Sequence, residues 1–223
     1  MATQHLNLEE QEQLANLKSF WADYGRTIIL AVVVFIAAVG GWSGWNWYQN
    51  KQAQGATMLY DQLTQAITAS DQERVKQVTL QMQVDYKSTY YASLASLLTA
   101  SYLHQQNDLD SAADLLAWVK DNGKDKGWNA LAVLRLADVL TDQKKYDEAL
   151  AVLSLNVPDD FLPHVADKRG NVYIAQGDTA KAKEAFLEAY KGLTAAEHKI
   201  FVAKKLSLLG VDMKEPTPVP VGV

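Results

Sequence analysis

One stretch of the chain carries no charged side chain. No Asp, Glu, Lys or Arg lies between Arg26 and Lys51, and most of the 22 residues from Thr27 to Tyr48 are apolar. A helix of that length covers roughly 30 Å, the thickness of a bilayer's hydrocarbon core. Its nine most apolar side chains favour membrane insertion by roughly 3–5 kcal/mol in total. We therefore predict a membrane-spanning helix at residues 27–48 rather than a buried core helix, because core helices rarely stay free of charge for so long.

Aromatic side chains flank this apolar block on both sides. Trp42, Trp45 and Trp47 follow it, and Phe20 and Trp21 precede it. Such rings prefer the headgroup layer, where one end of the side chain is apolar and the other is wet. The 26 residues ahead of the block carry four acidic side chains, unlike the short basic start of a cleaved signal peptide. We therefore expect an uncleaved membrane anchor.

The basic residues near the span predict its orientation. Lys18 and Arg26 lie on its N-terminal side, and only Lys51 lies close on the other side. Because basic residues favour the cytoplasmic side, we expect residues 1–26 to be a cytoplasmic segment and the C-terminal part to be exported. The cytoplasmic segment is expected to form a helix at the membrane surface or, alternatively, to dock a cytoplasmic partner.

Small residues gather in the second half of the span. Gly40 and Gly44 form a small-xxx-small pair, and Ala37 and Gly41 lie on a neighbouring face. Glycine allows the backbone of another helix to approach closely. These four residues are therefore candidates for packing against a transmembrane partner or a second copy.

Three segments after the span align with one another. They begin at Ala100, Ala137 and Gly170, which are 37 and 33 residues apart. A small residue in the middle of a helix lets an antiparallel helix approach, and a large residue one turn later fills the space beside it. We expect the turns between helices at residues 107–108, 144–145 and 177–178. The residues that define this repeat register are Ala100, Ala112, Ala137, Ala149, Gly170, Tyr173, Gly177, Ala182 and Phe186.

The third unit resembles the tetratricopeptide repeat (TPR). It reads GNVYIAQGD from Gly170 and continues with Ala182 and Phe186. The resemblance implies an all-α fold at residues 49–210, a TPR-like α-solenoid in which each helix pair buries its apolar face against the next pair. We expect a further helix pair at residues 56–86 with a break near Ser70, a loop at 156–163 and a capping helix at 194–209. Residues 211–223 are proline-rich and are expected to be a disordered tail.

In TPR domains, the first helix of each pair lines a concave surface that binds peptide segments. The resemblance therefore implies a groove, although any one of its positions could instead serve ordinary packing. A lining of mixed polar and apolar side chains suits loose recognition of extended chains. The groove residues expected on this register are Leu97, Ser101, His104, Leu134, Asp138, Thr141, Asp167, Asn171 and Ile174.

The sequence offers little that indicates chemistry. It contains no cysteine, which excludes disulfides, thiolate zinc sites and thiol catalysis. Its four histidines lie far apart along the chain, and the adjacent Asp159 and Asp160 are expected in a loop. The net charge of -5 disfavours generic binding to nucleic acid. We therefore expect that the protein is not an enzyme and that it has no metal site and no cofactor.

The layout as a whole resembles a particular family. LKSFW begins at Leu17, GWSGW begins at Gly41 at the end of the span, and ADKRG and QGD begin at Ala166 and Gln176. Together these segments are similar to the YfgM family, the ancillary subunit of the bacterial SecYEG translocon. The resemblance implies an inner-membrane protein with a periplasmic TPR-like domain. It also implies three partners: SecYEG, a PpiD-like periplasmic chaperone and exported unfolded polypeptides.

The resulting hypothesis is a non-enzymatic adaptor at the translocon exit that works with this chaperone on emerging polypeptides. Two alternatives use the same layout. The first is a scaffold that organises envelope-assembly or division proteins through the same groove. The second is an anchor that sequesters a cytoplasmic regulator through the N-terminal segment.

Overall fold

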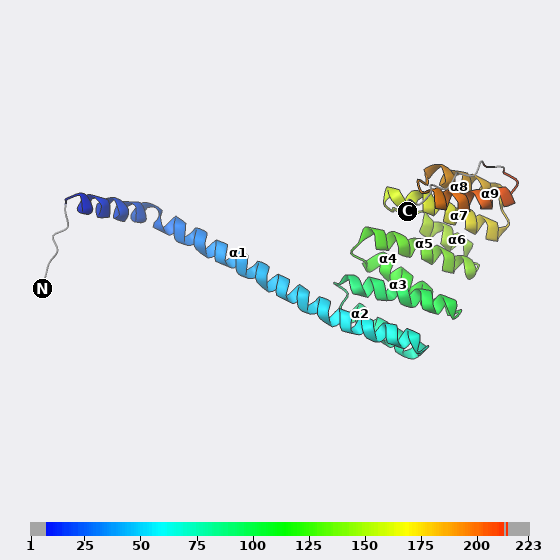
Figure 1. Ribbon diagram of the computed structural model, residues 1–223, viewed down its shortest axis with the longest axis horizontal. Coiled ribbons are helices and arrows are strands. Elements are labelled where there is room, and N and C mark those ends of the chain that lie inside the picture. Colours follow the sequence, from blue (N-terminus) through cyan, green and yellow to red (C-terminus); the bar gives the residue numbers. More distant parts are fainter. Residues whose placement is uncertain (1–7, 212, 214–223) are drawn as a thin grey trace, which may run out of the picture. The chain divides into compact units, whose positions relative to one another are not determined.

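A computed structural model describes residues 8–211 and residue 213. Over these residues the chain forms nine α-helices and one 3₁₀ turn, with no strand (Figure 1). The all-α prediction is therefore confirmed. Contacts within the chain divide it into two units, with the boundary between Gln52 and Ala53.

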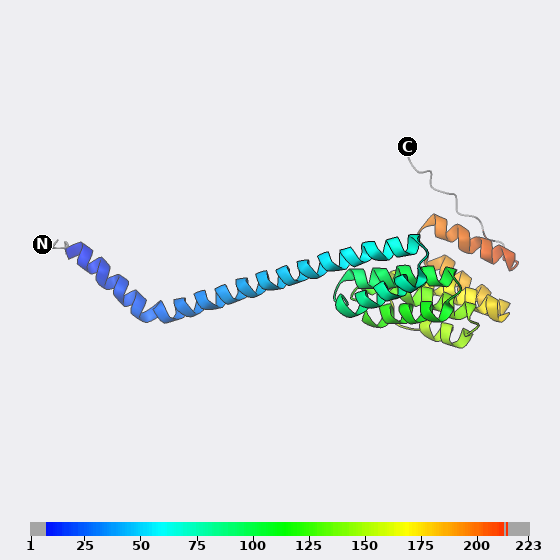
Figure 2. The same ribbon diagram turned by 90° about the horizontal axis from the view of Figure 1, so that it is seen from below.

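Helix α1 (Leu8–Thr68) contains the predicted span. It is much longer than the span itself, because no proline occurs before Pro158 and nothing in the sequence forces an early stop. Figure 2 shows one bend, in the blue part of this helix. Its apolar side chains are exposed, with Phe35 at 69% and Trp42 at 70%. The helix is long and apolar enough to cross a membrane, and an exposed apolar band of this length fits lipid rather than water.

The second unit begins with the end of α1 and helix α2 (Gln72–Asp85). The break predicted near Ser70 is confirmed: Ser70 has a φ of 55°, and the Asp71 carboxylate accepts a hydrogen bond from the Arg74 N–H at 3.0 Å. This is an N-cap that satisfies one free donor of the next helix. Leu63 and Met82 are completely buried between these two helices and the next one, α3 (Tyr90–Gln105).

Three helix pairs follow, in agreement with the three aligned segments. The paired helices are α3 (Tyr90–Gln105) with α4 (Leu109–Asn122), α5 (Lys126–Asp142) with α6 (Tyr146–Leu153), and α7 (Leu162–Gln176) with α8 (Thr179–Gly192); α9 (Ala196–Leu208) follows them. Each helix packs against the next along the chain, and α5 also packs against α7. The buried apolar side chains form three clusters that follow one another along the stack, as expected for a solenoid stabilised by its nearest neighbours.

The turns inside the three pairs have one geometry. Asn107, Lys144 and Gly177 take left-handed φ angles of 61°, 61° and 84°. In each turn the next residue donates its N–H to a carbonyl five residues back, as Asp178 does to Tyr173 at 2.9 Å. This Schellman arrangement ends the first helix of the pair and turns the chain into the second. The predicted turn positions are confirmed.

The small residues of the repeat register lie at the contacts between paired helices. The five alanines of the register are at most 1% exposed. A Cβ atom built on Gly170 would lie only 2.4 Å from a ring carbon of the buried Phe186, so α7 and α8 meet here at glycine distance. Tyr173 is half-buried, and Gly177 takes the left-handed turn conformation.

The segment 156–163 is not the plain loop that was predicted. It contains the 3₁₀ turn η1 (Asp159–Phe161), and α7 already begins at Leu162. Pro163 favours this early start, because proline fits the first turn of a helix, where its missing N–H has no partner to lose. The tail predicted at 211–223 lies, except for Val211 and Met213, outside the described residues.

Candidate protein-binding surface

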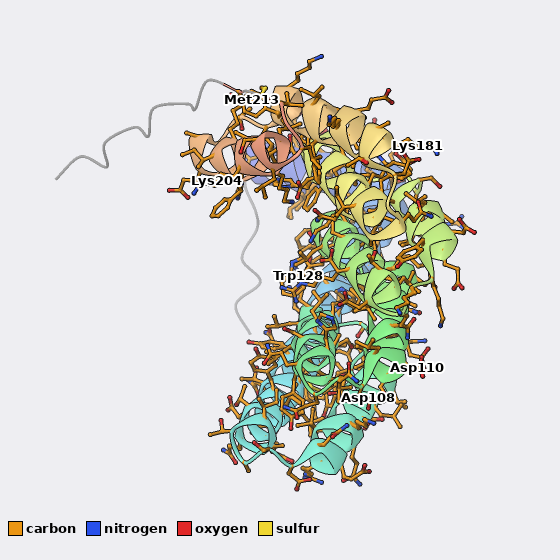
Figure 3. All side chains as sticks on the ribbon, turned by 90° about the vertical axis from the view of Figure 1, so that its right-hand side faces the viewer. Asp108, Asp110, Trp128, Lys181, Lys204 and Met213 are labelled. Atoms are coloured by element: carbon orange, nitrogen blue, oxygen red, sulfur yellow. The ribbon has the colours of Figure 1, made fainter. Side chains whose placement is uncertain are left out.

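The helix pairs of the second unit stack into an arc (Figure 3). Trp128 of α5 lies on the inner side of this arc, whereas Asp110 of α4 and Lys181 of α8 lie on the outer side. The first helices of the pairs therefore supply the inner face, as the TPR resemblance implies. We call the side of the arc that carries Trp128 the inner face.

An apolar cavity of about 470 Å³ opens around Trp128. Side chains from α1, α3, α5 and η1 form its walls, so it lies where the first two repeat pairs and the end of α1 meet. We call it the Trp128 cavity. Its lining residues are Tyr60, Leu94, Leu97, Leu98, Asp125, Gly127, Trp128, Leu131, Arg135 and Phe161.

The start of α5 positions the backbone that carries the indole ring. The Asp125 carboxylate accepts a hydrogen bond from the backbone N–H of Trp128 at 2.9 Å, which caps the helix. Leu131 follows one turn later on the same face. A Cβ at Gly127 would lie 3.1 Å from Asp125 Oδ1, so the missing side chain leaves room for this cap. The α5 wall of the cavity therefore follows from local helix geometry.

Arg135 gives the Trp128 cavity a positive edge. Its guanidinium donates to the Leu97 carbonyl at 3.4 Å, a long hydrogen bond, and the residue is half-buried. Among the residues that the structure describes, no Asp or Glu forms an ion pair with it. The one carboxylate of the lining, Asp125, caps α5.

Most polar residues predicted for the groove instead join successive helices of the inner row. His104 Nε2 on α3 lies 2.6 Å from Asp142 Oδ2 at the end of α5. Lys168 on α7 reaches Asp138 on α5 at 2.5 Å. These contacts hold the repeats to one another, a role that the sequence analysis did not assign to them.

The same arrangement continues to the last helix. Lys205 on α9 donates to both carboxylate oxygens of Asp167 at 2.6 and 2.9 Å, and to the Asn171 side chain at 3.0 Å. Its ammonium also lies 5.1 Å from the centre of the Phe186 ring. Thr141 donates within its own helix, to the Ala137 carbonyl at 2.6 Å.

The other predicted groove residues have different surroundings. Leu134 is 7% exposed and belongs to the core, so it offers almost no surface to a partner. Leu97 is also buried but forms part of the Trp128 cavity. Ser101 is half-buried and Ile174 is exposed. Of the nine predicted residues, therefore, only Leu97 lines this cavity.

One member of an ion pair and one member of a histidine pair have a shifted pKa. Burial raises the pKa of the Asp138 carboxyl, against the attraction of Lys168. The rings of His164 and His198 lie edge to face with their centres 5.2 Å apart, although the two residues are far apart along the chain. Burial, and then the charge of His198, lowers the pKa of His164. Within the described residues, no three His, Cys, Asp or Glu side chains are placed to hold a metal ion.

The candidate packing positions in the span face open space within the described chain. A Cβ built on Gly40, Gly41 or Gly44 would meet no atom within 4 Å, and Ala37 is exposed. A close approach by another helix is therefore sterically possible, and packing at this surface stays a prediction.

Comparison with known proteins identifies the family. A family model described as a tetratricopeptide repeat-like domain matches residues 18–211. A curated protein of Neisseria gonorrhoeae, named "Ancillary SecYEG translocon subunit", is 34% identical over 82% of this chain and 88% of its own length. The chain belongs to this translocon-subunit family.

Two further members support the assignment. The ancillary SecYEG translocon subunits of Haemophilus influenzae and Escherichia coli are 26% and 29% identical to this chain. The matches cover 87% and 79% of this chain, and 95% and 85% of the relatives. The resemblance stated from the sequence is therefore confirmed. The region that the family model matches includes both the apolar part of α1 and the repeat unit.

Proposed function

We propose that this protein is an ancillary subunit of the SecYEG translocon that holds exported polypeptides on its inner face. The observation that carries the proposal is the similarity, over most of the chain, to proteins named ancillary SecYEG translocon subunit. The fold supports it, because an arc of helix pairs offers an extended surface suited to polypeptide segments. The exposed apolar part of α1 supports attachment to the membrane.

The proposal includes an orientation. Lys18 and Arg26 precede the span and Lys51 follows it, so the N-terminus is cytoplasmic and the repeat unit is periplasmic. The membrane is then the bacterial inner membrane. In this place the repeat unit is able to meet polypeptides as they leave the translocon, together with a PpiD-like membrane-anchored chaperone.

The proposed role is binding and not catalysis. On the inner face, the carboxylates of Asp138, Asp142 and Asp167 are engaged by basic side chains of neighbouring helices. These pairs stabilise the stack and use the groups that acid–base chemistry would need free. The apolar Trp128 cavity is the feature of this face that suits a ligand.

A crosslinking pulldown from native membranes tests the proposal. Full-length tagged protein is crosslinked in cells, purified in detergent and analysed by mass spectrometry. A matched variant keeps the repeat unit but replaces residues 27–48 with the span of an unrelated protein, which tests whether the native span contributes. Translocon subunits and the chaperone are expected with the native chain. Recovery of envelope-assembly or division proteins, or of a cytoplasmic regulator, without any translocon subunit would refute the proposal.

A further inference from the structure

We propose that the Trp128 cavity binds a large apolar side chain of an extended polypeptide, and that Arg135 binds a carboxylate two or three residues away in the same polypeptide. The inference rests on the proposed function, because it names the recognition that a polypeptide-holding inner face would use. It concerns residues that the repeat register does not single out.

The apolar half of this subsite is set by the walls of the cavity. Trp128, Leu98 and Tyr60 contribute apolar surface from three different helices. The volume of about 470 Å³ exceeds the roughly 150 Å³ of an apolar cavity that accommodates a benzene ring. One phenylalanine or leucine side chain and part of its backbone therefore fit, whereas a folded domain does not.

The charged half comes from Arg135. Two other basic side chains that join helices of the inner row are paired: Lys168 with Asp138, and Lys205 with Asp167. Within the part of the chain that the structure describes, Arg135 has only the long hydrogen bond to the Leu97 carbonyl, although it is half-buried beside apolar walls. A guanidinium in such surroundings gains a strong, charge-assisted hydrogen bond from an incoming carboxylate. Charge complementarity therefore selects an acidic ligand over a basic one.

The spacing along α5 selects an extended polypeptide. Leu131 and Arg135 are four residues apart, and Trp128 and Arg135 are seven apart, which corresponds to roughly 6 and 10 Å along a helix. An extended chain advances about 3.3 Å per residue, so it covers these two distances with two and three residues respectively. Alternate residues of an extended chain project to the same side. A phenylalanine or leucine followed by any residue and then Glu or Asp matches the subsite.

Fluorescence anisotropy with defined peptides tests the inference on the full-length protein in lipid nanodiscs. The probe is a labelled ten-residue host peptide of glycine and serine with one phenylalanine and, two residues later, one glutamate. Replacing the phenylalanine by alanine is expected to weaken binding about tenfold. Replacing the glutamate by lysine is expected to weaken binding at least about fivefold.

The decisive measurement is a charge exchange. The variant Arg135→Glu is expected to bind the glutamate peptide at least about fivefold more weakly and to prefer the lysine peptide. The matched control Lys191→Glu reverses an exposed charge on α8 and should leave both affinities unchanged. A variant that merely misfolded would lose both peptides and could not gain the lysine peptide, so the rescue separates recognition from stability.

Three results would overturn the inference. The first is binding that depends on the phenylalanine but ignores both the glutamate and the charge of residue 135, which would mark a general apolar or lipid-binding site. The second is loss of both peptides by Arg135→Glu without rescue by lysine. The third is peptide binding unaffected by any of these changes. If exported chains nevertheless crosslink to the inner face at other positions, the subsite fails while the proposed function stands.

Discussion

Replacing Gly170 by alanine is expected to destabilise the contact between α7 and α8. The added Cβ would lie 2.4, 2.5 and 2.8 Å from three ring carbons of Phe186, all far inside van der Waals contact. The ring cannot easily move, because it is 1% exposed and packed among Ala166, Ala182 and Leu206. Overpacking of this kind costs about 1–3 kcal/mol.

The helix itself prefers alanine, and this offsets part of the cost. Alanine is better than glycine inside a helix by about 1 kcal/mol. We therefore expect Gly170→Ala to lower the free energy of unfolding by about 1 kcal/mol, with a range of roughly 0–2. For a unit of this size, 1 kcal/mol lowers the Tm by about 2–4 °C.

A double-mutant cycle isolates the steric term. Phe186→Leu replaces the ring that the Cβ would strike with a smaller side chain. The double variant should therefore be more stable than the sum of the two single effects predicts, by about 1–3 kcal/mol. Thermal melting by circular dichroism in nanodiscs gives the global change, and hydrogen exchange of α7 and α8 shows whether the loss is local. Additive effects of the two substitutions would refute the proposed close approach.

Three further predictions concern the capping helix, pH and topology. Lys205→Met should weaken the contact of α9 by about 1 kcal/mol and speed hydrogen exchange there, whereas the neighbouring exposed Lys204→Met should not. The pKa of His164 is lower in the folded chain, so the unfolded chain takes up the proton first as the pH falls. Stability should therefore fall as the pH drops through about 6.5, the ordinary pKa of histidine. His164→Gln should reduce this dependence, as measured by thermal melting at a series of pH values. The native chain has no cysteine, so the single variants Lys191→Cys and Glu12→Cys report topology. A membrane-impermeant maleimide, applied to cells with a permeable outer membrane, should label Lys191→Cys and not Glu12→Cys.

The helix pairs were predictable because their signals are local. Asn107 and Gly177 tolerate the left-handed φ angle that ends a helix, and the spacing of small and large residues places Gly170 opposite Phe186. Such features depend on residues within one repeat. A sequence read by itself therefore indicates the turns and the close contact of each pair.

The use of the inner face was not predictable in the same way. Leu134 was expected in the groove but lies in the core, because α5 is packed by α4, α6 and α7. Asp138 and Asp167 meet lysines 30 and 38 residues further along the chain, and no local pattern records such pairs. One sequence feature pointed to the Trp128 cavity: Trp128 and Leu131 lie one turn apart near the start of the first helix of a pair. The repeat register does not include either residue.

The most direct test of the proposed function is photo-crosslinking to an exported chain arrested in the translocon. A photoreactive amino acid is placed at Leu94, which lines the Trp128 cavity, and separately at the exposed Asp114 on α4. If the inner face holds exported polypeptides, we expect light-dependent crosslinks to the arrested chain from position 94 and few or none from position 114. Equal crosslinking from both positions, or none from either while the protein remains bound to the translocon, would contradict it.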